Sequence, residues 1–278
     1  MAKDPLIHIP KAYPIFQRFA LQSKGFLRDI RSFDIMRWED TSYGTHIEQK
    51  MDIFELNDLA PRDGWPTVLM IHGGGWVSGT PQSLHHLAPR FSRKGIMACT
   101  VQYRLAPQHQ WPSPLHDIFA ALDFLRAQQV DLSRIALWGF SAGAHLALRA
   151  AQLYPHPIAA VVALAPPVNL DALSFDQWQE CFSQEQCTTA SPINDPSSLP
   201  PTLIVHGTHD KIFPFAESLR FSQRENVTLW PLEGGNHGLH LPLLAARNLK
   251  KRAFQWLVDT LDLPQRGSKW KRRKKKNR

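Results

Sequence analysis

Ser141 is the residue whose surroundings most clearly indicate chemistry. It is the centre of the run Gly139-Phe-Ser-Ala-Gly143, which lies between a β-like run at 134–138 and an alanine-rich helical run at 144–153. In a G-x-S-x-G pattern of this kind, a sharp strand-to-helix turn strains the serine backbone, and the two glycines relieve the crowding. The hydroxyl then projects above the sheet, and the helix N-terminus directs free N–H groups at developing negative charge. We therefore predict that Ser141 is a nucleophile.

A serine nucleophile needs a base to take its proton and a carboxylate to orient that base. His237 lies in Gly234-Gly-Asn-His-Gly238, directly after a β-like run, and the glycines would let the loop carry the imidazole back over the sheet. Asp210 ends the run His206-Gly-Thr-His-Asp210, directly after another β-like run. We predict that His237 is the base and that Asp210 fixes its tautomer. The rival carboxylates, both in an irregular segment, are Asp171 and Asp195.

Donors for an oxyanion are predicted from the run His72-Gly-Gly-Gly-Trp76, which follows an apolar β-like run. Consecutive glycines let backbone N–H groups approach a substrate oxygen with no side chain in the way. We predict that the N–H groups of Gly74, Gly75 and Ala142 form the oxyanion hole. His72 is expected to brace this loop by hydrogen bonding rather than to act as a base.

The elements that must position these residues alternate along the chain. Several β-like runs are apolar throughout, which is typical of parallel strands covered on both faces by helices. In such sheets the active site forms at the carboxyl ends of the strands, where each motif above is found. The predicted strands are 47–56, 67–72, 96–102, 134–138, 158–164, 202–206 and 227–232, and the predicted helices are 82–94, 114–129, 142–153, 215–224 and 241–261.

The domain organisation follows from this pattern. Residues 46–264 are predicted to form one doubly wound α/β domain, a size at which a single chain buries a large core. An N-terminal segment, 1–45, and an excursion over the sheet edge, 166–200, could together form a small cap. We place a short helix around 174–182 within that excursion. The last segment, 265–278, is predicted to be a disordered basic tail.

The positive charge is concentrated in this tail. The formal net charge is +8, and residues 269–278 contain eight lysines and arginines and no acid. The rest of the chain is formally neutral, with 24 basic and 24 acidic residues, so the charge does not indicate a nucleic-acid-binding face. The tail could touch RNA, an anionic membrane or an acidic partner, or it could be a passive solubilising tail.

Cysteine usage and hydropathy favour a cytoplasmic location. Cys99 lies in an apolar run, while Cys181 and Cys187 are close enough in sequence to reach each other in a loop. Three cysteines do not make a disulfide framework, and a reducing compartment is the simpler interpretation. We find no secretory signal, no membrane span and no cysteine or histidine spacing typical of zinc. We expect no metal and no cofactor, and the oligomeric state stays open.

Taken together, the motifs resemble the α/β-hydrolase superfamily, and within it the carboxylesterase branch related to hormone-sensitive lipase, from about residue 45 to residue 262. Tyr103-Arg-Leu-Ala-Pro107 is similar to that branch's Y-R-L-A-P element. The run 139–147 and the runs between 191 and 214 are closer to small bacterial acetyl-xylan or feruloyl esterase-like enzymes. The resemblance implies a mostly parallel sheet of eight strands with flanking helices, and the roles given above to Ser141, Asp210 and His237. The stretch 171–190 matches nothing in the family pattern.

The resulting prediction is a serine carboxylesterase that hydrolyses short- to medium-chain or aromatic carboxylic esters through an acyl-enzyme. Trp76, Phe140 and Phe213 are the candidate walls of the substrate pocket. An alternative is an arylformamidase acting on a substrate like N-formylkynurenine, because such enzymes share the H-G-G-x-W and S-A-G-A-H-L features. The Y-R-L-A-P element favours ester over amide chemistry. A further alternative is a non-catalytic hydrolase-fold module whose tail touches nucleic acid or membrane.

Overall fold

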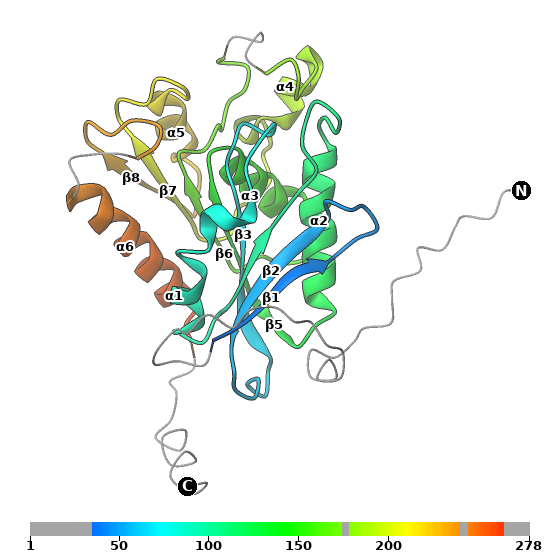
Figure 1. Ribbon diagram of the computed structural model, residues 1–278. Helices are drawn as coiled ribbons and strands as arrows, with labels where there is room; N and C mark the ends of the chain where they lie inside the picture. The colour runs from blue at the N-terminus through cyan, green and yellow to red at the C-terminus, as the bar shows by residue number, and fades with distance from the viewer. Residues whose placement is uncertain (1–34, 174–177, 240–243, 264–278) are drawn as a thin grey trace, which may run out of the picture.

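The computed structural model describes residues 35–173, 178–239 and 244–263, and one sheet forms its centre (Figure 1). The sheet has eight strands in the order β1-β2-β4-β3-β5-β6-β7-β8. Strand β2 runs antiparallel to both of its neighbours, β1 and β4, and the other pairings are parallel. The strands are β1 (Ile35–Ser42), β2 (Lys50–Leu56), β3 (Trp65–Ile71), β4 (Met97–Val101), β5 (Val130–Phe140), β6 (Ala160–Leu164), β7 (Thr202–Gly207) and β8 (Val227–Leu232). The predicted fold class, a mostly parallel eight-stranded sheet, is confirmed.

Helices cover both faces of this sheet (Figure 1). Leu69 and Ile71 of β3 face a core cluster that also contains side chains of α2 and α3, such as Leu122. The alternate residues of β3 face the opposite cluster, which contains Phe91 of α1 and Phe254 of α6. The helices are α1 (Ala88–Ser92), α2 (Ser113–Arg126), α3 (Ala142–Leu153), α4 (Gln184–Ala190), α5 (Phe215–Phe221) and α6 (Leu244–Thr260), with short 3-10 turns at Pro81–Leu84 and Pro192–Asn194.

Strand β1 is the element that the sequence did not indicate. It pairs with β2 at the edge of the sheet, and most of its residues are partly or fully exposed. Its sequence, Ile-Met-Arg-Trp-Glu-Asp-Thr-Ser, is largely polar, as expected for an edge strand that has water on one side. The described part of the sheet therefore reaches back to Ile35, ahead of residue 46, where we predicted the α/β domain to start.

The excursion after β6 differs from the prediction. A helix was expected around 174–182, but the described part of that range, from Trp178, forms a turn, and the helix is α4. The N-terminus of α4 is set by a capping box, in which Ser183 Oγ accepts from the Gln186 N–H and the Gln186 side chain accepts from the Ser183 N–H. Trp178 and Phe182 instead turn inward, against the ring of Trp76.

The predicted N-terminal segment up to residue 34 and the tail 265–278 lie outside the described residues. Among the helices that are described, none is both long enough and apolar enough to cross a membrane. Cys99, Cys181 and Cys187 are all buried free thiols. The predicted burial of Cys99 is therefore confirmed.

Candidate active site

Ser141 lies at the turn between β5 and α3. Its backbone has φ 53° and ψ −121°, a conformation that costs a non-glycine residue about 1–3 kcal/mol and is found at functional sites. A Cβ on Gly143 would lie 2.2 Å from the Ile71 oxygen, and one on Gly139 would lie 2.3 Å from the Gly143 oxygen. Only glycine fits at either position, because both obstacles are backbone atoms. The strained turn that the sequence predicts is therefore present.

The structure brings the three predicted residues into one hydrogen-bonded chain. His237 Nε2 lies 2.9 Å from Ser141 Oγ, and His237 Nδ1 lies 2.8 Å from Asp210 Oδ2. Because a carboxylate only accepts, Nδ1 carries the proton, and Nε2 is free to accept from the serine hydroxyl. Ser141 follows β5, Asp210 follows β7 and His237 follows β8, so all three stand at the carboxyl edge of the sheet.

The Asp210 carboxylate is buried and surrounded by donors. Its side chain has no exposed surface, and its Oδ1 accepts the N–H groups of Ile212 and Phe213 at 2.8 and 3.0 Å. Burial alone would raise the pKa of Asp210, but the hydrogen bonds from His206, His237 and the Phe213 backbone outweigh it and hold that pKa well below its usual range. Asp210 therefore stays ionised and holds the imidazole of His237 in place.

A second histidine, His206, contacts the same carboxylate oxygen. His206 Nε2 lies 2.9 Å from Asp210 Oδ2 and 3.1 Å from the Phe213 carbonyl oxygen. Both partners are acceptors, so Nε2 carries the proton, and Nδ1 accepts from Ser218 Oγ of α5 at 2.7 Å. The sequence analysis treated His206 only as the end of a strand. The available signal was its position four residues before Asp210, on the same strand end.

The glycine loop passes directly over the serine. A Cβ on Gly73 would lie 2.9 Å from the Phe140 oxygen and 3.2 Å from Ser141 Cβ. Gly74 has φ +125° and its carbonyl accepts from the N–H groups of Val77 and Ser78, which turns the loop back. No described residue accepts a hydrogen bond from the N–H of Gly74, Gly75 or Ala142. That these three N–H groups, selected from the sequence, form the oxyanion hole stays a prediction.

His72 has the bracing position that the sequence predicted. Its Nδ1 lies 2.8 Å from the Gly73 carbonyl oxygen, and its ring stacks on Tyr103 with centroids 4.4 Å apart. Burial lowers the pKa of His72 to about 4, so the ring is neutral near pH 7. A neutral ring that donates from Nδ1 holds the Gly73–Gly74 peptide in one orientation.

The candidate pocket walls divide into two groups. The rings of Phe140 and Phe213 lie 5.5 and 5.1 Å from that of His237, so they flank the base. Trp76 is only 1% exposed, which leaves it little surface to offer a substrate. Trp178 lies between these groups, 5.3 Å from Trp76 and stacked on Phe213 at 5.4 Å, and it is partly exposed. Trp178, which the sequence analysis did not select, is therefore better placed than Trp76 to contact a substrate.

A sequence model of the BD-FAE family matches residues 51–224, more than half of the chain. The chain belongs to the BD-FAE family. The match contains Ser141 and Asp210, while His237 lies beyond its end. The superfamily resemblance found in the sequence, to α/β-hydrolases of the carboxylesterase branch, is confirmed by this match and by the relatives described next.

Several named relatives of this BD-FAE member are esterases. Esterase LipC of Mycobacterium tuberculosis is 27% identical over 239 residues, which cover 72% of this chain and 59% of LipC. Carboxylesterase NlhH of the same organism is 39% identical over 98 residues, which cover 33% of this chain and 30% of NlhH. The chain thus spans less than two thirds of the length of the relatives it matches.

Solved structures share the fold. The apo form of Thermogutta terrifontis esterase 2 matches with a TM-score of 0.69 and 22% identity, covering 84% of this chain and 96% of that chain. A truncated carbohydrate esterase from gut microbiota matches with a TM-score of 0.68 and 18% identity, covering 82% of this chain and 97% of that chain. Both likenesses support the α/β-hydrolase architecture described above.

The rival carboxylates lie away from the base in this BD-FAE member. Asp195 Oδ2 accepts from Arg149 at 2.8 Å, and Asp171 Oδ1 accepts from Thr188 at 2.9 Å. Neither contacts His237. These two carboxylates instead hold together the segment that contains α4.

Proposed function

We propose that this chain is a serine carboxylesterase that hydrolyses short- to medium-chain or aromatic carboxylic esters through an acyl-enzyme. The observation that carries the proposal is the continuous hydrogen-bonded chain from Ser141 through His237 to Asp210. Family membership and the esterase names of the relatives support the same reaction class.

In the first half-reaction, Ser141 Oγ attacks the ester carbonyl carbon and His237 Nε2 takes its proton. Asp210, ionised and facing Nδ1, stabilises the imidazolium that forms. The carbonyl oxygen becomes an oxyanion and accepts hydrogen bonds from Gly74, Gly75 and Ala142. Fixed donors of this kind act where the charge develops, and loss of one typically costs about 10²–10³ in turnover.

The first half-reaction ends when the tetrahedral intermediate collapses to the acyl-enzyme and His237 gives its proton to the departing alkoxide, which leaves as the alcohol. A water molecule then attacks the acyl-Ser141 carbonyl while His237 takes one of its protons. Collapse of the second intermediate releases the carboxylic acid and returns the proton to Ser141 Oγ. The neutral tautomer of His237 that the cycle requires is the one fixed by Asp210.

The substrate class follows from the walls beside the imidazole. Phe140 and Trp178 are partly exposed there, while Phe213, only 3% exposed, packs against Trp178 and His237. Ring surfaces of this kind favour apolar or aromatic groups over charged ones. The names of the relatives favour esters over formamides as substrates. No feature of the described residues specifically favours the formamide alternative.

Initial rates on nitrophenyl esters of increasing acyl length test the proposal. Wild type is expected to hydrolyse the short and medium esters, and Ser141→Ala to lose the activity. Turnover of N-formylkynurenine, measured beside these esters, separates ester from formamide chemistry. Full ester hydrolysis by purified Ser141→Ala would contradict the proposed mechanism.

The cytoplasmic location and the role of the basic tail are part of the proposal. Three buried free thiols are compatible with a reducing compartment. We propose that residues 269–278 act as a solubilising tail separate from the catalytic domain.

A further inference from the structure

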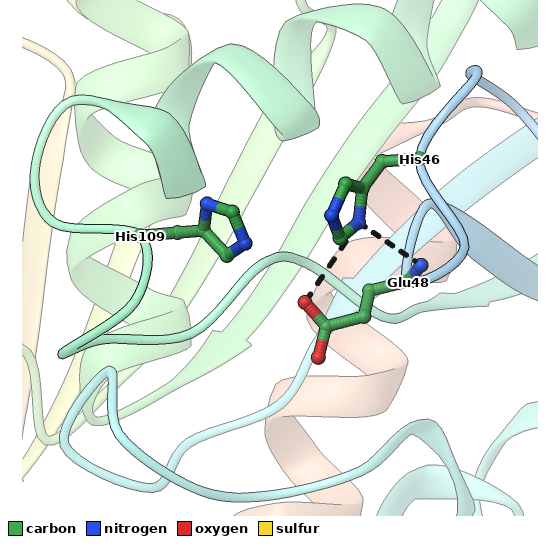
Figure 2. Close-up of side chains that lie close together, drawn as sticks. All are labelled: His46, Glu48 and His109. Carbon is green, nitrogen blue, oxygen red and sulfur yellow. Dashed lines mark hydrogen bonds and ion pairs between the residues drawn. The ribbon is translucent and has the colours of Figure 1, made fainter.

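Three side chains with metal-ligand chemistry converge at a place separate from the serine. His46 and Glu48 lie in the turn between β1 and β2, and His109 lies in the loop between β4 and α2. One ligand atom from each lies within 4.8 Å of the others. Figure 2 shows the two rings facing one another, with the Glu48 carboxylate beside the space between them. We propose that these three residues bind one divalent transition-metal ion, such as Zn²⁺, a site beyond the proposed esterase function.

The turn that supplies two of the ligands is held in one conformation. Tyr43 N donates to the Gln49 carbonyl and Gln49 N donates to the His46 carbonyl, both at 3.0 Å. The Gln49 side chain closes the turn, because its Oε1 accepts from the His46 N–H at 3.0 Å and its Nε2 donates to Asp117 of α2 at 2.7 Å. A pre-formed turn lowers the conformational entropy lost on binding a metal.

The loop that supplies His109 is anchored on both sides of that residue. Ala106 N donates to the Trp76 carbonyl at 2.9 Å, and Trp111 N donates to the Cys181 carbonyl at 2.9 Å. His109 N itself donates to the Leu105 carbonyl at 3.0 Å. The two backbones thus hold the imidazoles near each other without a metal.

The ring nitrogens needed for a metal are accessible. His46 Nδ1 accepts from the Glu48 N–H at 3.2 Å, so Nε2 is the nitrogen on the side of the ring that faces His109 in Figure 2. Binding at Nε2 moves the proton of the neutral ring to Nδ1, which ends the hydrogen bond from the Glu48 N–H and lets Nδ1 donate toward Glu48 Oε2, 3.9 Å away. No described residue makes a hydrogen bond with the ring of His109, whose contact is the His46 ring at 4.9 Å and 80°. That edge contact leaves a ring nitrogen of His109 free to bind.

The ligand atoms of this site, and the freedom of their side chains to rotate, suit a transition metal. Two imidazoles and a carboxylate are ligands that Zn²⁺, Cu²⁺ and Ni²⁺ accept, with water at the remaining positions. Ligand atoms in a tetrahedral zinc shell lie about 3.3 Å apart, given Zn–N bonds near 2.0 Å. The present spacing must therefore contract, and the side chains of His46 and Glu48, 35% and 41% exposed, have room to rotate.

The charges around the site also permit a cation. Arg104 is the guanidinium that interacts with the Glu48 charge. It is already neutralised by Asp117, through Nε bonds of 3.0 Å to both carboxylate oxygens and an Nη2 bond of 2.8 Å. The negative charge of Glu48 is therefore available to a metal. The sequence pattern did not indicate this site. His109 is far along the chain from His46 and Glu48, and only folding brings it next to their turn.

Isothermal titration calorimetry of the full chain with ZnCl₂ tests the site. Wild type is expected to bind one more equivalent of Zn²⁺ than His109→Ala. Glu48→Gln is expected to bind that additional equivalent with lower affinity. Loss of an outer-shell partner alone costs about 10–100-fold in metal affinity, so loss of a direct ligand should cost at least that much. Zn²⁺ should also raise the Tm of wild type more than that of His109→Ala, because binding to the native state stabilises it.

The control is His86→Ala, which removes an exposed histidine whose Nδ1 contacts the Ser83 carbonyl. It should bind Zn²⁺ with the wild-type stoichiometry, which separates this site from general binding to surface histidines. The same comparison with Co²⁺ should give visible absorption bands that His109→Ala lacks. Identical zinc isotherms for wild type and His109→Ala would overturn the proposal, and the esterase assays would be unaffected by that result.

Discussion

At the scale of single residues, the site is set by how hydrogen bonds are shared at one carboxylate oxygen. Asp210 Oδ2 accepts from both His237 and His206, and Oδ1 accepts two backbone N–H groups. Each additional donor spreads the negative charge and makes the carboxylate a weaker acceptor for His237. His206 is therefore a positioning residue for Asp210.

Removing the His206 donor should shift the pH profile of the reaction. In His206→Leu the carboxylate holds the His237 proton more tightly, so the acid limb of kcat/KM against pH should move to higher pH. A hydrogen bond to a charged group contributes about 1.5–3 kcal/mol, and this is the interaction that the substitution removes from Asp210. Ser218→Ala keeps the Nε2–H donor and should shift the limb less. An acid limb that stays at the wild-type pH in His206→Leu, with the fold intact by circular dichroism, would remove His206 from this role.

Asp210 should also make stability depend on pH in acid. Its pKa is lowered in the folded state, so it contributes stability that is present above the unfolded pKa, about 3.9, and is lost as pH falls toward the folded value. The difference in unfolding free energy between wild type and Asp210→Asn should therefore shrink as the pH falls below about 4. Urea unfolding at a series of pH values measures this. Ser141→Ala, which keeps every donor to Asp210, should follow wild type, and a constant difference between wild type and Asp210→Asn would contradict the prediction.

At the scale of elements, close approach of backbones fixes the turn between β5 and α3. A Cβ at Gly143 meets the carbonyl oxygens of Ile71 and His72 at 2.2 and 2.4 Å, and neither can move without disturbing β3 and the glycine loop. At Gly75 a Cβ meets nothing closer than 3.5 Å, although φ is +60°. Glycine is therefore required at position 143 for steric reasons and at position 75 because of its backbone conformation.

Gly143→Ala and Gly75→Ala should consequently differ. Overpacking costs about 1–3 kcal/mol, and at Gly143 the obstacles are rigid backbone atoms, so we expect the upper part of that range and loss of turnover. Gly75→Ala should cost about 1–2 kcal/mol from its left-handed backbone and leave the fold intact. Urea unfolding midpoints, with ester hydrolysis measured in parallel, check both. Equal midpoints for Gly143→Ala and wild type would contradict the steric account.

The elements also show where sequence reasoning works and where it fails. The inner strands β3 and β7 are buried throughout and were predicted to within a few residues, because burial on both faces leaves a strong apolar pattern. Strand β1 was missed because its edge position tolerates polar residues. The short helix expected around 174–182 is not formed in the described part of that range, where Trp178 and Phe182 pack on Trp76 from a turn, and α4 begins only at Gln184.

The site residues likewise divide into those that local sequence patterns indicate and those that tertiary contacts define. Ser141, Asp210 and His237 were selected because each follows a strand in a sequence with specific turn chemistry. His206 and Trp178 were not selected, because their roles depend on tertiary contacts with Asp210 and Phe213. The cluster of His46, Glu48 and His109 likewise exists only after β2 pairs with β4.

At the scale of the whole molecule, the proposed chemistry is contained in one sheet and its loops, while the positive charge lies in the tail. Deleting residues 269–278 should leave kcat/KM and the unfolding midpoint unchanged, because every proposed catalytic group lies between Gly74 and His237. Solubility near neutral pH should fall, because the remaining 24 basic and 24 acidic residues give no net charge. Activity assays and precipitation curves measure these effects. A loss of activity on deletion, or salt-sensitive RNA binding that the deletion abolishes, would assign the tail a different role.

The central claim, that Ser141 is the nucleophile, is tested most directly by trapping it. The full chain is treated with a fluorophosphonate, which phosphonylates an activated serine, and the intact mass and tryptic peptides are then measured. The account predicts one adduct, on the peptide that contains Ser141, at a rate that falls sharply in His237→Ala, and no adduct in Ser141→Ala. An unmodified wild-type chain, or an adduct that persists in Ser141→Ala, would contradict it.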